Sequence, residues 1–314
     1  MLDALYAHRL VFVTGKGGVG KSTLTAALGM HAARSGRRTL VCETDTFSAM
    51  EPLLAVGRPV GHQPVVAAQN LWACNIQSEQ SLADLVHRFV PSARLAKAAV
   101  SNRLARLFFR TAPSMYELSV LYRIKSLMDE RDGDGPRYDT IIIDLPATGH
   151  AITFLSVPET ANKVLRVGSV AEMSAELAAQ LRDPNITDLV IVCIPEEMPV
   201  NESIELHKAA HDKLGLLAET IFINMVRPAP VPEDGRAALE FLADKFEDEP
   251  GPGGIGVLAE GGELGLDWSR QDREYIGKLH RGIQGANFIE VPYIYRNESD
   301  VDLIRRIADH LNAP

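Results

Sequence analysis

Short runs of apolar residues recur along the chain, and most are separated by stretches in which apolar residues return every three or four positions. Several runs are nearly continuous in Val, Ile and Leu, which is typical of strands buried on both faces of a parallel sheet. The runs that we interpret as strands lie at residues 10–13, 39–42, 71–76, 140–143, 189–194, 220–223 and 288–291. This alternation predicts an α/β fold, with a doubly wound, mainly parallel sheet and helices on both of its faces.

The first helix is expected at about residues 20–35, directly after the first strand. Gly36 follows the basic Arg34, and a glycine after a basic last turn is a common helix end. Ligands of such sheets bind beyond the carboxyl ends of the strands. The residues that follow the predicted strands are therefore the first candidates for chemistry.

Two segments depart from the alternation. Residues 81–131 have helical spacing without an intervening strand, and we expect a helical subdomain inserted into the core. Residues 228–267 contain Pro-rich and Gly-rich stretches, and we expect a mobile loop region there. Residues 1–314 as a whole are expected to form a single domain, because a chain of this length can bury one large core.

A glycine-rich loop connects the first predicted strand to the first predicted helix. It consists of Gly15, Lys16, Gly17, Gly18, Val19, Gly20, Lys21, Ser22 and Thr23. In a strand–loop–helix of this kind, backbone N–H groups point at anionic oxygens and the helix N-terminus adds partial positive charge. Lys21 is expected to neutralise the β- and γ-phosphates of ATP, and the Ser22 hydroxyl to ligate Mg²⁺. The loop predicts a cradle for the phosphates of a nucleotide, with Mg²⁺ bound beside them.

Two acidic residues follow predicted strands and are candidates for the same site. Asp144 ends the strand at 140–143, and a carboxylate beside a phosphate loop normally holds Mg²⁺ directly or through water. Asp45 follows the strand at 39–42. The alternative for both residues is a structural role as a helix cap or turn residue.

The string GKGGVGKST resembles the deviant P-loop of dimeric ATPases, which include ArsA, the tail-anchored-protein-targeting ATPase, MinD, ParA and the nitrogenase iron protein. The resemblance implies that Lys16 acts in catalysis by reaching the nucleotide of a partner subunit; its alternative is a solvated surface lysine. The chain has one such motif. The resemblance therefore implies a homodimer, or a heterodimer with a paralogous ATPase.

Further segments resemble the ArsA family. Residues 144–150 are similar to its switch II segment, which contains the Mg²⁺-linked aspartate. Asp45 stands where the family has the catalytic aspartate that orients the attacking water. The Pro-Ala-His that follows this aspartate in the family is replaced here by residues 46–48, Thr-Phe-Ser.

The resemblance continues to about Leu311. Residues 195–203 are similar to a family loop near the nucleotide. Asn224 matches the asparagine that hydrogen-bonds adenine, and an amide can donate and accept at once; its alternative is a turn residue. Pro292 lies where the family packs backbone against the base. The implied function is a Mg²⁺-dependent, ATP-hydrolysing dimeric switch that handles a client or partner.

Composition and charge exclude some functions. The net charge of −9 argues against specific nucleic-acid binding, which needs a basic face. No apolar run approaches the roughly 20 residues that cross a bilayer. The three cysteines are few and odd in number, as expected of a cytoplasmic protein. They also fit poorly with arsenite binding, because soft As(III) needs several converging thiolates.

The predicted helical insert carries a local basic patch. Between Asp84 and Glu117 there are six basic residues and no acidic one. Residues 95–125 are therefore a candidate contact surface, and the resemblance to the tail-anchored-protein-targeting ATPase implies that it could bind a hydrophobic client or a membrane. The simpler interpretation is an apolar helix face packed on the core with a solvated charged edge. An alternative function for the whole chain is a ParA- or MinD-like positioning ATPase that binds a membrane or DNA surface.

Overall fold

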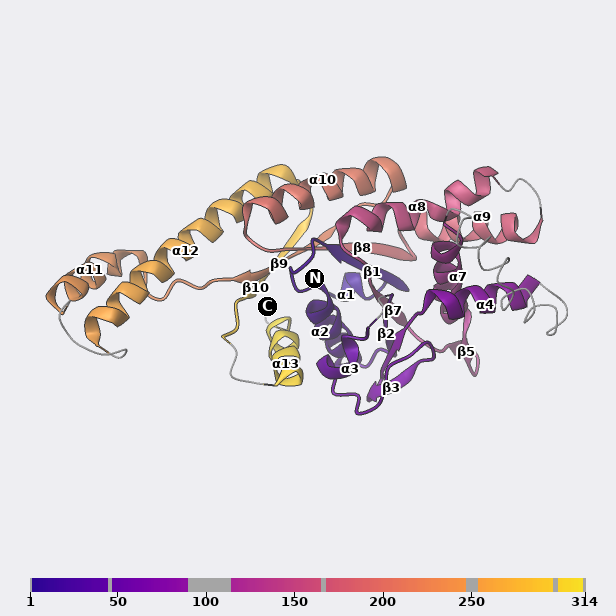
Figure 1. The fold of residues 1–314 in the computed structure, drawn as a ribbon, viewed down its shortest axis with the longest axis horizontal. Coiled ribbons are helices and arrows are strands. Elements are labelled where there is room, and N and C mark those ends of the chain that lie inside the picture. The colour runs from indigo at the N-terminus through magenta and orange to yellow at the C-terminus, as the bar shows by residue number, and fades with distance from the viewer. Residues whose placement is uncertain are drawn as a thin grey trace.

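The computed structural model of the chain describes residues 2–44, 47–89, 114–164, 168–246, 254–295 and 299–312. Its centre is an eight-stranded sheet with the order β10-β9-β8-β1-β7-β2-β4-β3 (Figure 1). The strands are β1 (Leu10–Gly15), β2 (Thr39–Glu43), β3 (Val65–Ala68), β4 (Leu71–Asn75), β7 (Thr140–Asp144), β8 (Thr187–Cys193), β9 (Thr220–Val226) and β10 (Asn287–Pro292). All neighbours are parallel except β3 and β4. The expected doubly wound, mainly parallel α/β sheet is confirmed.

Helices cover both faces of this sheet. They are α1 (Leu2–Leu5), α2 (Lys21–Arg34), α3 (Met50–Leu53), α4 (Ser78–Phe89), α7 (Met115–Asp129), α8 (Thr148–Val164), α9 (Ser169–Arg182), α10 (Glu197–Leu214), α11 (Arg236–Lys245), α12 (Ile255–Gly282) and α13 (Asp300–His310). Along β1, Leu10 and Phe12 enter the core under α7, α8 and α10, whereas Val11 and Val13 enter the core under α2 and α13. Because both faces are buried, the strand needs apolar residues at every position.

Strand register brings the candidate site residues to one edge of the sheet. Val13 of β1 pairs with Asp144 of β7, and Glu43 of β2 pairs with the same Asp144. The carboxyl ends of β1, β7 and β2 therefore meet beside the N-terminus of α2. This is the edge at which parallel sheets bind ligands.

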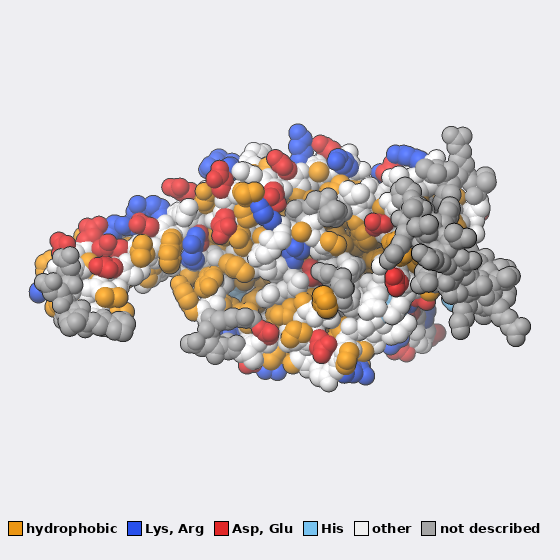
Figure 2. Space-filling view, viewed as in Figure 1, with side chains coloured by type: hydrophobic (Ala, Val, Ile, Leu, Met, Phe, Trp, Pro, Cys, Tyr) orange, Lys and Arg blue, Asp and Glu red, His pale blue; other side chains and the backbone are white. Residues whose placement is uncertain are grey.

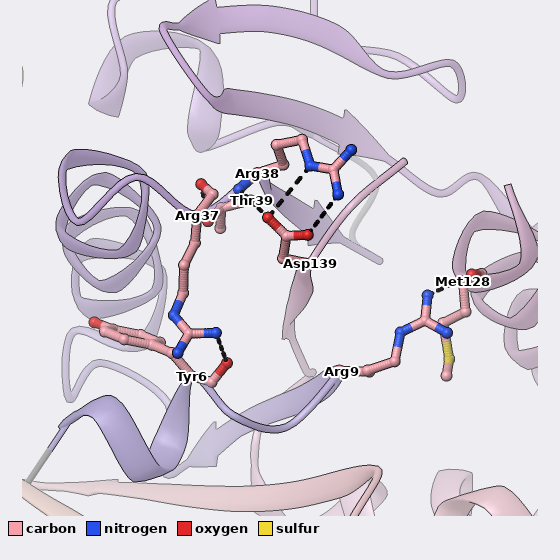
Figure 3. Close-up of polar contacts among 7 residues, drawn as sticks. All are labelled: Tyr6, Arg9, Arg37, Arg38, Thr39, Met128 and Asp139. Carbon is pink, nitrogen blue, oxygen red and sulfur yellow. Dashed lines mark hydrogen bonds and ion pairs between the residues drawn. The ribbon is translucent and has the colours of Figure 1, made fainter. Parts of the chain in front are cut away.

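At the amino ends of the strands, arginine side chains bond neighbouring segments of the chain to one another (Figure 3). Before β2, the Arg38 backbone N–H donates to Asp139 Oδ2 at 2.8 Å, and its Nη2 donates to Asp139 Oδ1 at 2.7 Å. Arg37 Nη1 donates to the Tyr6 carbonyl at 2.8 Å, and Arg9 Nη2 donates to the Met128 carbonyl at 2.7 Å. These bonds join the segments that precede β2, β7 and β1, so these arginines stabilise the fold.

The predicted helical insert is described only at its ends. Helices α4 and α7 pack against each other between β4 and β7, and a short hairpin of β5 (Arg131–Asp132) and β6 (Gly135–Pro136) follows. Residues 90–113, which carry most of the basic patch, lie outside the described residues. The inserted subdomain at 81–131 and its contact surface at 95–125 stay predictions.

The expectation of a loop region at residues 228–267 is wrong for most of that segment. A short 3-10 turn (Glu233–Gly235) leads into α11, and α12 begins at Ile255; residues 247–253 lie outside the described part. Two glycines of this segment allow α12 to pack closely, one against α11 and the other against the residues that precede it. A Cβ on Gly262 would lie 3.0 Å from Leu239 Cδ1, and one on Gly265 would lie 3.0 Å from Pro230 Cγ. Tertiary packing therefore outweighs the low helix propensity of glycine.

Within the described residues, no helix combines the length and the apolar composition needed to cross a membrane.

Candidate nucleotide-binding site

The glycine loop follows β1 directly and has the backbone conformation of a phosphate cradle. Gly18 and Gly20 both have φ of 87°, in the left-handed region that favours glycine. A Cβ on Gly15 would lie 2.2 Å from the carbonyl oxygen of Val192 on the neighbouring β8. Val19 is buried between the exposed Gly17 and Gly18 on one side and α2 on the other. The loop thus needs glycine where its backbone turns and where it passes β8.

The first turn of α2 brings together the predicted phosphate and magnesium ligands. Ser22 Oγ donates to Asp144 Oδ2 at 2.5 Å, and Lys21 Nζ donates to the Lys16 carbonyl at 3.1 Å. A hydroxyl and a carboxylate are hard oxygen donors of the kind that Mg²⁺ prefers. No cluster of three or more His, Cys, Asp or Glu side chains occurs in the described ranges. The donors present fit a Mg²⁺ ion that takes its other ligands from phosphate and water.

Lys16 reaches a different part of the protein. Its Nζ forms an ion pair with Glu202 Oε1 of α10 at 2.8 Å, with 27% and 33% of the two side chains exposed. A pair so open to solvent contributes only about 0–1 kcal/mol to stability. Lys16 can therefore leave Glu202 at little cost when a phosphate competes for it.

A cavity of about 520 Å³ opens above the loop, within the size range of small-molecule sites. It is lined by Gly18, Gly20, Lys21, Ser22, Thr23, Asn224, Met225, Pro292, Tyr293, Ile294, Leu303 and Ile307. Asn224, near the end of β9, is buried, and its Nδ2 donates to the Val19 carbonyl at 2.8 Å. The structure therefore places the two predicted base-binding residues, Asn224 and Pro292, beside the phosphate loop.

The cavity wall contains backbone irregularities that sequence reasoning missed. Met225, directly after Asn224, has φ of 58°, which is uncommon for a residue with a long side chain. The pairing of β10 with β9 shifts register between Glu290 and Pro292. Such irregularities cluster at functional sites. The sequence gives no signal for either one, since neither glycine nor asparagine marks the position of Met225.

Glu43 is a second residue that sequence reasoning missed. It ends β2, is buried, and accepts hydrogen bonds from the backbone N–H groups of Ala49 and Met50 at 2.6 and 3.2 Å. Its other oxygen accepts from Ser48 Oγ at 2.5 Å. Glu43 thus anchors the segment that follows Asp45. The signal was present in the sequence, as an acidic residue directly after the apolar run at 39–42.

Three further predictions concern Asp45, residues 144–150 and residues 195–203. Asp45 lies outside the described residues. Residues 148–150 of the switch II segment form the first turn of α8. Residues 195–203, expected as a loop, instead lead into α10 at Glu197, and that helix approaches the glycine loop through Glu202.

Two of the three cysteines meet in the core. Cys74 Sγ donates to Cys42 Sγ at 3.1 Å, between adjacent strands, and both are free thiols. Burial raises the pKa of the Cys42 thiol well above its usual range, and the contact with Cys74 raises it further. Cys193 is also buried, which raises its pKa to about 11. Cys193 lies on β8, three strands away from β2, so the three thiols do not converge as an As(III) site would require.

Comparison with known proteins agrees with this geometry. The family model of the anion-transporting ATPases, ArsA_ATPase, matches residues 8–178 and 166–248, which is more than half of the chain. A putative arsenical pump-driving ATPase of Halobacterium salinarum is 28% identical over 240 residues, covering 70% of this chain and 36% of the relative. The chain thus spans about a third of that relative's length.

Other relatives are covered more fully. The ATPase BagA of Mycobacterium tuberculosis is 29% identical over 291 residues, which are 90% of this chain and 81% of BagA. The ATPase GET3 of Kluyveromyces lactis is 28% identical over 235 residues, with 63% and 67% covered. By its family match and its phosphate loop, this chain belongs to the anion-transporting ATPase (ArsA) family, and its class of activity is that of an ATPase.

Proposed function

We propose that this protein is a Mg²⁺-dependent ATPase that binds ATP between the glycine loop and the Asn224–Pro292 wall and works as a nucleotide-switched dimer. The observation that carries the proposal is the contact of Ser22 with Asp144 at the start of α2, directly beside the 520 Å³ cavity. In this arrangement, hydrogen-bond donors for phosphate, oxygen ligands for Mg²⁺ and space for a base lie next to one another.

The loop and Lys21 hold the triphosphate. Backbone N–H groups and the positive end of α2 receive phosphate oxygens, and Lys21 exchanges the Lys16 carbonyl for the β- and γ-phosphates. A bound Mg²⁺, held by Ser22 and Asp144, would neutralise charge on the phosphates during the reaction. Asn224 is proposed to hydrogen-bond the purine, exchanging its contact with the Val19 carbonyl for the base.

Hydrolysis transfers the γ-phosphoryl group to water. The water oxygen forms a bond to phosphorus, the bond to the β-phosphate oxygen breaks, and ADP, phosphate and a proton are released. Asp45 is proposed to orient the water, because such reactions depend mainly on positioning and charge stabilisation. Glu43, two residues earlier, supports the segment on which Asp45 lies.

Lys16 is proposed to complete the site of a second subunit, in a homodimer or with a paralogous ATPase. Its weak pair with Glu202 holds the side chain beside the loop until a partner's phosphate replaces the carboxylate. ATP would join two subunits in this way, and hydrolysis would release them. We further propose that this change controls contact with a client or partner in the cytoplasm.

The test compares wild type with Lys16→Ala, and with Lys208→Ala as the control, since Lys208 is exposed on α10. ATPase rate and molecular mass are measured with and without nucleotide. Lys16→Ala should lower kcat by about 10²-fold or more, as expected for loss of a cation that stabilises the transition state. It should also abolish the mass increase with ATP. A monomeric Lys16→Ala variant with wild-type hydrolysis would contradict the dimer mechanism.

A separate measurement tests the alternative of a positioning ATPase. Wild-type protein with ATP is sedimented with DNA and with anionic liposomes. The net charge of −9 predicts no nucleotide-dependent cosedimentation with either one. Cosedimentation that requires ATP would favour the ParA- or MinD-like function.

A further inference from the structure

A helical arm extends from the body of the protein at the far end from α4 and α9 (Figure 1). We define the arm as α11 together with residues 255–268 of α12. Its two helices pack on each other through Leu239 and Gly262. The arm lies beyond β9 and β10, apart from the residues that line the nucleotide cavity.

One face of α12 on the arm is apolar and exposed. Val257, Leu264 and Trp268 have exposed fractions of 48%, 54% and 47%. Together with Gly261 they are spaced by four, three and four residues, which places them in one line along the helix, as in the seam of a coiled coil. No atom lies within 4 Å of a Cβ built on Gly261, so the seam has room for a close neighbour.

The seam is not the face by which α12 packs on the protein. Ala259, Leu266 and Ser269 of the same helix are buried. A globular protein normally buries one helix face and covers the other with polar residues. An exposed line of large apolar side chains at coiled-coil spacing instead marks a surface for another helix.

Figure 2 shows acidic side chains on the arm, and two of them lie along one flank of the seam. Glu260 and Asp267 each lie one position before a seam residue, where coiled coils place charges that select the partner. The arm has five acidic and two basic residues in all. Of the basic ones, Arg236 pairs with Asp267 at 2.7 Å, and Lys245 lies over the Phe241 ring at 5.5 Å.

We propose that the arm docks an amphipathic helix of another protein, one with an apolar seam and Lys or Arg on its flanks. The charges decide between occupants. In an antiparallel pair of two arms, Glu260 would face the acidic flank of the second copy, which is destabilising, although Arg236 already offsets the charge of Asp267. An anionic lipid surface would be repelled by the same carboxylates. A basic helix satisfies both the apolar seam and the acidic flank.

The inner end of the seam is attached to the strand that carries Asn224. The Arg227 backbone N–H donates to Asp272 Oδ2 at 2.7 Å, and its guanidinium lies 5.7 Å from the centre of the Trp268 ring. Asp272 itself is buried. These contacts tie Asp272 and Trp268, at the inner end of the seam, to the end of β9.

Trp268 gives a direct signal for docking. The chain has two tryptophans, so the Trp72→Phe protein has Trp268 as its sole indole. The probe is a synthetic 21-residue helix with Leu at its seam positions and Lys on both flanks. The control peptide has Glu at every Lys position. We expect the Lys peptide to change Trp268 fluorescence, with weaker binding at higher salt, and the Glu peptide to have no effect.

Variants test whether the Lys peptide binds the seam itself or is attracted only by the negative charge of the protein. Leu264→Asn and Val257→Asn should each weaken Lys-peptide binding about tenfold or more, because seam residues act as apolar anchors. Glu260→Lys should weaken it as well. Leu217→Asn, which replaces an equally exposed leucine outside the arm, should leave binding unchanged.

Three results would overturn the proposal. The first is that the Lys peptide binds wild type and Leu264→Asn equally well, and the second is that the Lys and Glu peptides bind equally well. The third is that Leu264→Asn loses self-association, which would assign the seam to a second copy of the chain. The ATPase rate of Leu264→Asn without peptide should equal that of wild type, since the arm does not line the cavity. Failure of the docking proposal would therefore be distinguishable from failure of the proposed ATPase mechanism.

Discussion

Glu43 shows how a single buried carboxylate can organise a loop. It accepts hydrogen bonds from Ser48 Oγ and from the backbone N–H groups of Ala49 and Met50. An ionised acceptor makes each of these bonds stronger than a neutral one would. The position of the chain after Asp45 therefore depends on the two carboxyl oxygens of Glu43.

Replacing Glu43 by Gln tests this dependence. One oxygen becomes an NH₂ group that cannot accept from Ser48, and the negative charge is lost. We expect kcat for ATP hydrolysis to fall about 10- to 100-fold with little change in ATP affinity, because a shift of about 1 Å in a positioning group has effects of this size. Steady-state kinetics and ATP titration measure the two quantities. Glu51→Gln on the adjacent α3 serves as the control, and an unchanged kcat in Glu43→Gln would contradict the role.

Asp188 makes stability depend on pH. Burial raises the pKa of this carboxyl to about 6, from an ordinary value of 3.8, although nearby His8 favours the charged form. A raised carboxyl pKa contributes stability that is fully present below the unfolded value of 3.8. That contribution is lost as the pH rises through about 6, because the folded protein must then hold a buried charge.

Asp188→Asn should remove this pH dependence. From pH 5 to pH 8 the folded wild type releases one proton that the unfolded chain has already lost, which lowers its free energy of unfolding by about 1–1.5 kcal/mol. Between pH 5 and pH 8, the free energy of unfolding of Asp188→Asn should therefore fall by about 1–1.5 kcal/mol less than that of wild type. Denaturant unfolding at both pH values measures the difference. The asparagine keeps an oxygen for the Leu189 N–H. A decline equal to that of wild type would show that Asp188 does not titrate in this range.

At the scale of elements, the buried strands were predictable and the exposed or tightly packed elements were not. β1 and β8 are buried at every position, so their apolar runs are continuous. The edge strand β3 has only four residues, which are alternately half-buried and exposed, and it was not among the predicted strands. The packing of α11 on α12 could not be predicted, because a glycine that permits close approach has the same local signal as one that breaks a helix.

The candidate site was predictable to a similar degree. The glycine loop and Asp144 were identified because phosphate and Mg²⁺ binding need fixed residue types at fixed spacing. The contacts of Lys16 with Glu202 and of Asn224 with Val19 depend on strand order, and they join residues 186 and 205 positions apart. Strand order cannot be read from the pattern of any one segment.

Two adjacent glycines in α12 give a matched test of the packing argument. A Cβ on Gly261 meets no atom within 4 Å, whereas one on Gly262 would lie 3.0 Å from Leu239. Both variants to Ala gain helix propensity, worth about 1 kcal/mol. Gly261→Ala should therefore raise the free energy of unfolding by about 0.5–1 kcal/mol. Gly262→Ala should gain less or lose stability, because the Leu239 side chain must move. Equal gains in denaturant unfolding would show that the close approach of the two helices is not needed.

At the scale of the whole molecule, stabilising contacts and the candidate site lie at opposite ends of the strands. The arginine contacts lie at the amino ends of the strands, and the cavity with its loop lies at the carboxyl ends. The arm extends to one side of both. Each part can therefore be changed with limited effect on the other two, and a ligand that binds the cavity should stabilise the entire domain.

Nucleotide and Mg²⁺ should stabilise the protein in two separable steps. A ligand that binds only the folded chain adds about 2.7 kcal/mol at a concentration of 100 times Kd. ADP alone should raise the unfolding midpoint through the loop and Lys21, and Mg²⁺ should raise it further through Ser22 and Asp144. In Ser22→Ala the ADP step should remain while the Mg²⁺ step falls, because the hydroxyl ligand is gone. As the control, Ser35→Ala should keep both steps, because Ser35 lies at the other end of the same helix and its hydroxyl donates to the His31 carbonyl. An undiminished Mg²⁺ step in Ser22→Ala, measured by thermal unfolding with and without chelator, would mean that the metal is held elsewhere.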